Sequence, residues 1–218
     1  MNQVLATAKY VSDHSESVRL NKRRLKKFCK SFNRSDAKHW LSESPFDFSR
    51  LAKDEEKMNF LFVYSTTGFC YWGDPPWSVE YRGQNHQGSF GMIAALGRAV
   101  EAGVPLLDPR YRARMGREEL EEVLDGNITI PMLEDRLRFI RESGSVLMGR
   151  YGGLMSTLVQ SGGGDVSVLL GQLVKQFSSF EDHSLYDGRE ICFHKKAQLF
   201  VSDLYQLFGE SDGVVSAT

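Results

Sequence analysis

The chain has 218 residues, which suits one large domain or two small ones, each with a buried core. Its hydrophobic fraction of 41%, charged fraction of 25% and formal net charge of −1 imply no global attraction to nucleic acid or acidic membranes. The three cysteines lack CxxC spacing, no apolar run approaches the roughly 20 residues of a membrane span, and the first residues lack a signal-peptide layout. We therefore expect a cytoplasmic protein without membrane contact, disulfide bonds or structural zinc.

A basic amphipathic helix is predicted within residues 16–32. Its apolar side chains recur at helical spacing, opposite the basic run Lys22–Lys27. Such a run is typical of the solvated face of a helix, but it can also contact phosphate groups. Both interpretations remain open on the sequence alone.

Residues 60–83 contain the most distinctive pattern of the chain. The continuous apolar run at 60–64 predicts a buried strand, and the alternation at 78–82 predicts a second short strand. Between them four aromatic residues surround a Pro-Pro turn: Phe69, Tyr71, Trp72 and Trp77. These rings either pack a hairpin onto the core or line a slot for a flat ligand ring.

The remainder of the chain is mostly helical by periodicity. Helices are predicted over residues 90–100, 118–124, 131–147, 166–177 and 195–208, with Arg136 facing away from the apolar stripe of the third and Asp165 capping the fourth. Residues 84–88 are expected to form a turn, and residues 191–193 a short extended run. Gly162-Gly163-Gly164 is not a phosphate-binding Walker loop, because no strand precedes it and no GK[ST] follows it, so we expect a flexible link. The predicted fold is mainly α, a single helical domain over 1–218 with one or two short β-hairpins.

The start of the last helix carries the first candidates for chemistry. Lys195 and Lys196 oppose the helix dipole there, at a cost of about 0.3–1 kcal/mol for each exposed charge. Either they are solvated, or they reach a phosphate, a ribose hydroxyl or a carboxylate. Asp203 follows Lys196 by seven residues, which is two helical turns, so the two side chains share a face. Asp203 is flanked by apolar residues, and a buried aspartate needs a partner.

Other catalytic patterns are missing from the sequence. The five histidines show no HExxH or i, i+4 pairing, and there is no GxSxG motif. Cys70, between two aromatic residues, is typical of a small packed side chain rather than of a catalytic thiol. We expect neither a metal nor a cofactor.

Four segments in order resemble the queuosine salvage proteins, which are queuosine 5′-phosphate N-glycosylases. The segments span most of the chain: FLFVYSTTGFCYW, WSVEYRGQNHQGSFGMIAALGRA, MLEDRLRFIRESGSVLMGRYGG and FHKKAQLFVSDLY. Family members show a Phe-rich segment ending in Asp-x-Leu-Asn-Phe-x-Phe-Trp, a Gly-Tyr…Ala-Leu-x-Arg-Ala helix and a Phe-x-Lys-Arg-Ala-Gln…Asp helix. Their order and spacing make a chance match implausible.

This resemblance implies a helical fold similar to DNA glycosylases and release of the base queuine from a nucleotide. Breaking the N-glycosidic bond develops positive charge on the ribose, which a nearby carboxylate stabilises. The base would stack on Phe69, Tyr71 or Trp72. The sugar-binding lysine of the family matches Lys195, and Asp74 and Asp203 would add polar contacts. The implied partner is a small nucleotide, without a stable nucleic-acid complex.

The chain departs from the family pattern at several positions. Ser65 and Gly68 stand where the family has aspartate and asparagine, and Gly97 replaces another asparagine. The catalytic aspartate of the family lies in a Phe-Ala-Asp-Tyr-Arg segment that would follow Thr218. The resemblance therefore implies a domain that lacks its C-terminal part.

Two alternatives to the enzyme remain open. One is a non-catalytic helical module that binds a nucleotide or transfer RNA through the Lys22–Lys27 face. The other is a relative that has lost the ligand, which the changes at Ser65 and Gly68 favour. The enzyme hypothesis requires the rings of Phe69–Trp72 and the ammonium of Lys195 to converge on one nucleotide-sized hollow.

Overall fold

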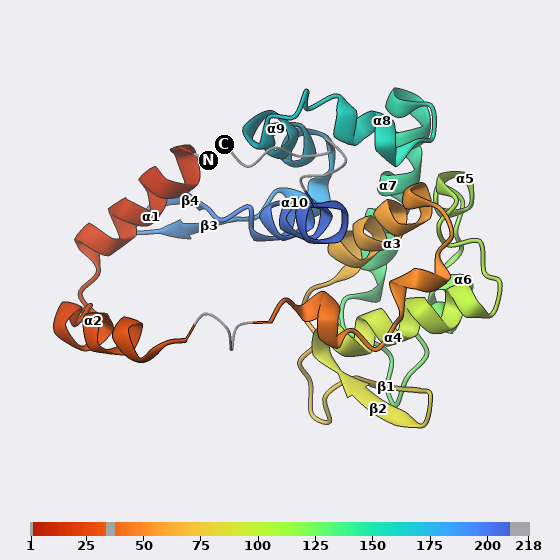
Figure 1. The fold of residues 1–218 in the computed structure, drawn as a ribbon, viewed down its shortest axis with the longest axis horizontal. Helices are drawn as coiled ribbons and strands as arrows, with labels where there is room; N and C mark the ends of the chain where they lie inside the picture. Colours follow the sequence, from red (N-terminus) through yellow and green to blue (C-terminus); the bar gives the residue numbers. More distant parts are fainter. Residues whose placement is uncertain (1, 34–37, 210–218) are drawn as a thin grey trace.

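The structure, a computed structural model, describes residues 2–33 and 38–209. The chain folds into a mainly α arrangement with two short antiparallel hairpins, as the sequence predicts (Figure 1). The α-helices are α1 (Asn2–His14), α2 (Lys22–Ser31), α3 (Asp54–Thr67), α4 (Gly88–Glu101), α5 (Pro109–Arg112), α6 (Arg117–Val123), α7 (Leu133–Tyr151), α8 (Met155–Gln160), α9 (Val166–Gln176) and α10 (Lys195–Phe208). Short 3₁₀ helices are η2 (Trp40–Glu43), η3 (Phe48–Arg50) and η4 (Ser178–Phe180).

The two hairpins lie far apart in the sequence. Strand β1 (Ser78–Tyr81) pairs with β2 (Gln84–Gln87), so that Ser78 lies opposite Gln87. Strand β3 (His183–Tyr186) pairs with β4 (Arg189–Cys192). The strand predicted at 78–82 is confirmed over 78–81, whereas residues 84–87, expected to form only a turn, provide its partner. The similarity to DNA glycosylases stays a prediction.

Helix α3 contradicts the predicted strand at residues 60–64. Asp54, Glu55 and Glu56 occupy its first turn, where their charges favour the helix dipole. The apolar run that follows is buried on every side, because α3 packs against α7 on one side and α10 on another (Figure 1). A helix buried all round shows no polar face, so its sequence lacks the helical period. A short apolar run of this kind is indistinguishable from a strand by pattern alone.

Aromatic side chains fill the core around α3. The ring of Phe62 lies within 5.6 Å, centroid to centroid, of three other buried rings: Phe177, Phe180 and Phe200. Phe60 stacks on Phe46 at 4.7 Å. These contacts join the middle of α3 to α10, to residues 177–180 and to the segment before α3.

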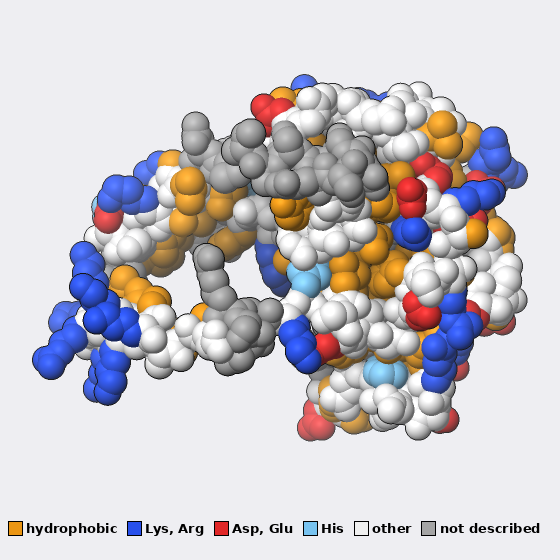
Figure 2. Space-filling view, in the orientation of Figure 1, with side chains coloured by type: hydrophobic (Ala, Val, Ile, Leu, Met, Phe, Trp, Pro, Cys, Tyr) orange, Lys and Arg blue, Asp and Glu red, His pale blue; other side chains and the backbone are white. Residues whose placement is uncertain are grey.

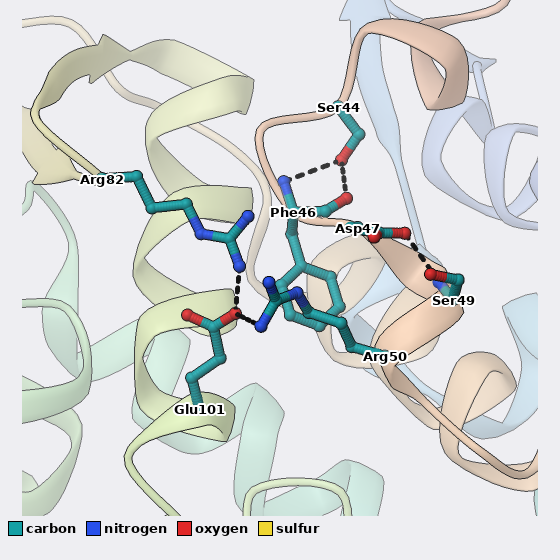
Figure 3. A network of polar contacts seen from close by, with 7 residues as sticks. All are labelled: Ser44, Phe46, Asp47, Ser49, Arg50, Arg82 and Glu101. Carbon is teal, nitrogen blue, oxygen red and sulfur yellow. Dashed lines mark hydrogen bonds and ion pairs between the residues drawn. The ribbon is translucent and has the colours of Figure 1, made fainter.

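A polar network ties the segment at 44–50 to α4 and the first hairpin (Figure 3). The carboxylate of Glu101, at the end of α4, accepts from Arg82 at 2.5 Å and lies 3.2 Å from a guanidinium nitrogen of Arg50. Asp47 accepts from the backbone N–H of Ser49 at 2.9 Å and so caps η3, and the Ser49 hydrogen bonds lower the pKa of that carboxyl. The two ion pairs of Glu101 thus link η3 and the turn of the first hairpin to the end of α4.

One of the two N-terminal helices was predicted. Helix α1, which the periodicity did not reveal, packs on β4, and the buried Thr7 hydroxyl accepts from the Cys192 amide at 3.2 Å. Helix α2 confirms the helix predicted within residues 16–32, and none of its residues is buried. Its apolar face is therefore as exposed as its basic face, which stands out at one end of the molecule (Figure 2). Within the described residues, no helix is long and apolar enough to cross a membrane.

The helices predicted at 166–177 and 195–208 are confirmed as α9 and α10, whereas α8 was not predicted. Asp165 follows the glycine-rich link and caps α9, accepting from the amide of Ser167 at 2.7 Å. The extended run that the sequence predicts at 191–193 belongs to β4 as far as Cys192. Helix α10 begins at Lys195 and buries one face against α3 and α9, which places both lysines at the edge of the core.

Candidate nucleotide-binding site

Three segments meet where α3 ends: residues 68–77, the first half of α7, and the start of α10. Phe69 from the first and Phe139 from α7 form an edge-to-face pair with ring centroids 5.6 Å apart. The ammonium nitrogen of Lys196, from α10, lies 4.7 Å from the Phe69 centroid and 5.4 Å from that of Phe139. Aromatic faces attract a cation at these distances. We call Phe69, Phe139, Arg136 and Lys196 the aromatic–cation cluster.

Arg136 holds the main chain of residues 67–70 in place. Its guanidinium donates to the carbonyls of Thr67 and Phe69, and to that of Cys70 at 2.9 Å. Its Cζ also lies 4.3 Å from the Phe69 ring centroid. The sequence prediction that Arg136 faces away from the apolar stripe is wrong, since the residue is 0% exposed. Burial lowers the pKa of Arg136 to about 10, so it stays charged at neutral pH.

The two lysines of α10 point to different places. The Lys195 side chain is exposed and lines an apolar groove of about 640 Å³ between α1 and α10, together with Val4 and Leu199. Its backbone N–H donates to Asp182 at 3.3 Å. Lys196 is half-buried on the aromatic rings, and burial lowers its pKa to about 8. The structure thus brings Lys196, and not Lys195, to Phe69.

Asp203 forms a second polar centre on α10. Its side chain is 1% exposed, and its Oδ1 accepts from the indole nitrogen of Trp40 at 2.8 Å. The Nε2 of His39 lies 3.3 Å from the same oxygen. Because His39 Nδ1 accepts from the Leu41 amide at 3.3 Å, its Nε2 carries the proton and donates to Asp203. These two side chains are the partners that a buried aspartate requires.

The other oxygen of Asp203 is unusual. Within the described part of the chain, Oδ2 is buried without a hydrogen-bond partner. Burial raises the pKa of Asp203 to about 6, against the lowering effect of the Trp40 hydrogen bond. An unsatisfied buried carboxylate oxygen is costly unless a ligand or water group completes it. The atom is therefore available to a donor group such as a hydroxyl.

Two tyrosines lie between Asp203 and the aromatic–cation cluster. The Tyr64 ring lies 5.3 Å from that of Trp40, and burial, with the charge of Asp203, raises the pKa of Tyr64 to about 12. A Cβ added at Gly68 would lie 2.9 Å from the Tyr71 hydroxyl, so the glycine lets that hydroxyl approach α3. The Arg136 Cζ lies 5.6 Å from the Tyr71 ring centroid. The two centres thus belong to one connected set of side chains.

The remaining predicted residues lie farther out. Trp72 is 75% exposed, and Asp74 is also exposed on the same segment. Trp77 belongs to the core, where it donates to the Leu124 carbonyl at 3.3 Å and stacks on Tyr71. The segment is therefore neither a plain hairpin nor a slot lined by four rings. Phe69 belongs to the aromatic–cation cluster, Trp77 to the core, and Trp72 is exposed to solvent. Tyr71 stacks on Trp77 and lies near Arg136.

The sequence did not single out several members of this site: Trp40, Tyr64, Arg136 and Phe139. A usable signal existed for Arg136, which lies three residues after Leu133 and four before Ile140, both on the buried stripe of α7. No comparable signal marks Trp40, which reaches Asp203 across 163 residues of sequence. Among the described residues, no group of histidines, cysteines and carboxylates could hold a metal ion.

Comparison with known proteins shows which family the sequence of this chain matches. The sequence profile described as "Queuosine salvage protein" matches residues 48–216, which include the whole aromatic–cation cluster and Asp203. Helices α1 and α2 lie before the matched region.

Curated relatives carry the name queuosine 5′-phosphate N-glycosylase/hydrolase. The protein from Sphaerobacter thermophilus is 39% identical over 158 residues, covering 72% of this chain and 49% of its own. The mouse protein is 29% identical over 73% of this chain and 49% of its own. The protein from Schizosaccharomyces pombe is 26% identical over the whole chain and 70% of its own length. The chain spans about half the length of the first two relatives. The profile match over residues 48–216 and the sequence identity to these relatives place this chain in the queuosine salvage protein family.

Proposed function

We propose that this chain supplies the ligand-binding part of a site that hydrolyses the N-glycosidic bond of queuosine 5′-phosphate and releases queuine. The family match over residues 48–216 carries the proposal, because it contains every member of the connected set from Asp203 to Lys196 except Trp40 and His39. We further propose that the reaction takes place in the cytoplasm and needs no cofactor.

The residue types suit this chemistry. Water attacks the anomeric carbon as the bond to the base breaks, so positive charge develops on the ribose and a carboxylate stabilises it. Phe69 and Tyr71 provide ring faces for the base. Asp203 Oδ2, with no partner among the described residues, suits a ribose hydroxyl. Trp72 and Asp74, which are exposed on the same segment, would form the rim.

Two roles expected from the resemblance remain proposals. A sugar contact by Lys195 would require the ligand to reach the groove side of α10, where that ammonium lies. The catalytic carboxylate expected beyond Thr218 would come from additional polypeptide. We therefore propose that the 218 residues bind the nucleotide, and that full activity requires the carboxylate in a longer version.

Mass spectrometry for free queuine tests the function directly. Queuosine 5′-monophosphate is incubated with the 218-residue chain and with a full-length version of the protein. We expect release by the full-length version, and less than 10% as much, roughly a loss of 1.4 kcal/mol or more of transition-state stabilisation, from the 218-residue chain. No release by the full-length version would contradict the proposed reaction.

Helix α2 supports a second candidate, binding of transfer RNA. Six of its ten residues are lysine or arginine, and none is buried. Binding driven by phosphate contacts would weaken steeply with salt, with a slope of about −0.7 to −0.9 for each phosphate neutralised. Titration of transfer RNA at several salt concentrations, with Lys26→Gln/Lys27→Gln as the comparison variant, measures this. A salt-independent affinity that the variant shares would contradict it.

A further inference from the structure

The ammonium of Lys196 rests against two ring faces. Its Nζ lies 4.7 Å from the centroid of Phe69 and 5.4 Å from that of Phe139. Among the residues that the structure describes, no carboxylate forms an ion pair with Lys196, and its ammonium donates no hydrogen bond. A lysine that only stabilises a fold is normally either solvated or paired with a carboxylate. Lys196 is half-buried at the start of α10, so neither description fits it.

The surroundings of Lys196 make its neutral amine form accessible near pH 7. Burial is the largest effect and lowers the pKa of Lys196 to about 8. The charges of Arg136 and Lys195 act in the same direction, whereas Asp182, the Cys70 thiol and the ring faces act in the opposite one. At pH 7 about a tenth of this lysine is therefore neutral, against fewer than about one in a thousand for an ordinary lysine with a pKa of about 10.4.

A neutral lysine amine is a nucleophile for carbonyl compounds. Lysines that are desolvated in apolar surroundings, or that lie beside a second cation, form imines with aldehydes and ketones. Lys196 meets both conditions, because the Cζ of Arg136 lies 4.3 Å from the centroid of the Phe69 ring that Lys196 also contacts. Arg136 uses its donors on backbone carbonyls, so its charge acts from a fixed position. The exposed Lys195 does not contact these rings.

An acceptor for a sugar hydroxyl lies on the same face of α10. Asp203 follows Lys196 by two helical turns, about 10 Å along the helix axis. Its Oδ2 is buried and has no hydrogen-bond partner among the described residues. A carboxylate oxygen accepts from a hydroxyl, and the lysine side chain and an extended sugar together reach across this distance. The two groups therefore suit a polyhydroxy aldehyde better than an apolar one.

We propose that Lys196 is a nucleophilic amine that forms an imine with the aldehyde of an open-chain aldose. Neutral Nζ adds to the aldehyde carbon, while the aldehyde oxygen takes up a proton and the nitrogen releases one. Loss of that oxygen as water leaves a C=N bond, so the step uses no oxidant or reductant. This activity goes beyond the proposed hydrolysis, which needs no amine nucleophile, although the sugar that hydrolysis releases is itself an aldose.

Pentane-2,4-dione tests the amine directly, because it converts a neutral lysine into a stable enaminone. The wild-type chain is treated at pH 7, and the labelled lysines are located by peptide mass spectrometry. We expect Lys196 to react at least about tenfold faster than the exposed Lys195, because more of it is neutral. The rate at Lys196 should level off above about pH 8. Equal rates at the two lysines, or a rate at Lys196 that still rises tenfold per pH unit above about pH 9, would overturn the inference.

Ribose with sodium cyanoborohydride tests the class of ligand. Reduction traps the imine as a secondary amine, which adds the mass of ribose less one oxygen atom to the lysine. We expect this label on Lys196 of the wild-type chain and of Lys175→Arg, an exposed control on α9. Lys196→Arg keeps the charge but has no neutral amine, so the label should be lost. Ribitol, which has the hydroxyls without the aldehyde, should give no adduct. A label spread evenly over the exposed lysines, or none on Lys196, would contradict the assignment.

Folding and hydrolysis are controlled separately. Circular dichroism melts show whether each variant is folded, and labelling of the wild-type chain requires no variant. Labelling also requires no hydrolysis, so an imine at Lys196 without queuine release by a full-length version would support this inference and sink the proposed hydrolysis. Queuine release with an unreactive Lys196 would overturn this inference alone.

Discussion

Burial of Asp203 makes the stability of the fold depend on pH. In the folded chain Asp203 is surrounded by the Trp40 indole, the His39 imidazole and the Tyr64 ring, and burial raises its pKa from 3.8 to about 6. The folded state therefore binds this proton more tightly than the unfolded chain does. Its contribution to stability is fully present below the unfolded pKa and is lost as the pH rises through about 6.

Replacing Asp203 by asparagine tests this electrostatic cost. We expect the free energy of unfolding of the wild-type protein to fall, relative to Asp203→Asn, by up to about 3 kcal/mol between pH 4 and 7. Urea denaturation at several pH values measures the difference. His39 lies beside Asp203 and burial lowers its pKa, so the difference between the two proteins is more informative than either curve. A difference that does not change with pH would show that Asp203 stays charged.

Gly97 is a packing residue in this structure, although the family pattern places an asparagine there. A Cβ at this position of α4 would lie 2.6 Å from a ring carbon of Phe46. We expect Gly97→Ala to lower the free energy of unfolding by about 1–3 kcal/mol, since the ring must move within a filled core. Gly149→Ala on α7 is the matched control, because nothing lies within 4 Å of its added Cβ. It should raise stability by about 0.5–1 kcal/mol. Equal effects at the two glycines would refute the packing argument.

At the scale of elements, the site depends on how α7 holds the end of α3. Arg136 connects the two helices through four carbonyls: Pro131 before α7, Thr67 at the end of α3, and Phe69 and Cys70 after it. A planar guanidinium reaches all four acceptors, whereas a single ammonium cannot. The position of the Phe69 ring thus follows from one buried side chain on a different helix.

Arg136→Lys should therefore loosen the segment without removing the charge. We expect a loss of about 2–4 kcal/mol in the free energy of unfolding, because buried carbonyls lose their donors. Hydrogen exchange should rise at residues 68–72 more than in α9. A matched control is Arg138→Lys, whose side chain is exposed and pairs with Asp135; there we expect a change within about 0.5 kcal/mol. Unchanged exchange at 68–72 would contradict the role given to Arg136.

At the scale of the whole molecule, α2 contributes little to the packed core. Leu25 and Phe28 on α2, and Phe32 at its C-terminal cap, are 46–62% exposed. Figure 2 shows the basic side chains of this helix gathered at the end of the molecule away from the body. Apolar side chains that are exposed in the native state lose little when the chain unfolds.

Polar replacements on α2 should therefore leave stability unchanged. We expect the combined variant Leu25→Ser/Phe28→Ser/Phe32→Ser to change the free energy of unfolding by less than about 0.5 kcal/mol at each site. Phe200→Ala, a fully buried control on α10, should cost about 3–5 kcal/mol. Chemical denaturation measures both. A comparable loss in the α2 variant would mean that these side chains are buried in solution.

Most helices could be predicted from the sequence because one face of each is buried and the other is solvated. Helices α9 and α10 show this alternation, and the capping residue Asp165 was recognisable before α9. Helix α4 is an exception, since all its residues from Gly91 to Gly97 are buried. The same rule explains the failure at 60–64, since α3 is buried all round and its sequence carries no period.

The spacing of residues along α10 also indicates which of the two lysines faces the core, which the family pattern does not. Lys196, Phe200 and Asp203 recur at helical spacing, and the last two are buried, so the face that meets the core passes through Lys196. Lys195 instead shares a face with the exposed Leu199. Helical geometry alone distinguishes the two lysines.

The sequence by itself determined the helical class of the chain, its family and the ring-rich segment that leads into the site. Only the tertiary structure decided which charges meet those rings, because Arg136, Lys196 and Trp40 reach their partners across 66 to 163 residues of intervening sequence. Such contacts depend on how whole helices pack, and the periodicity of a single helix reports only which face is buried, not what lies against it.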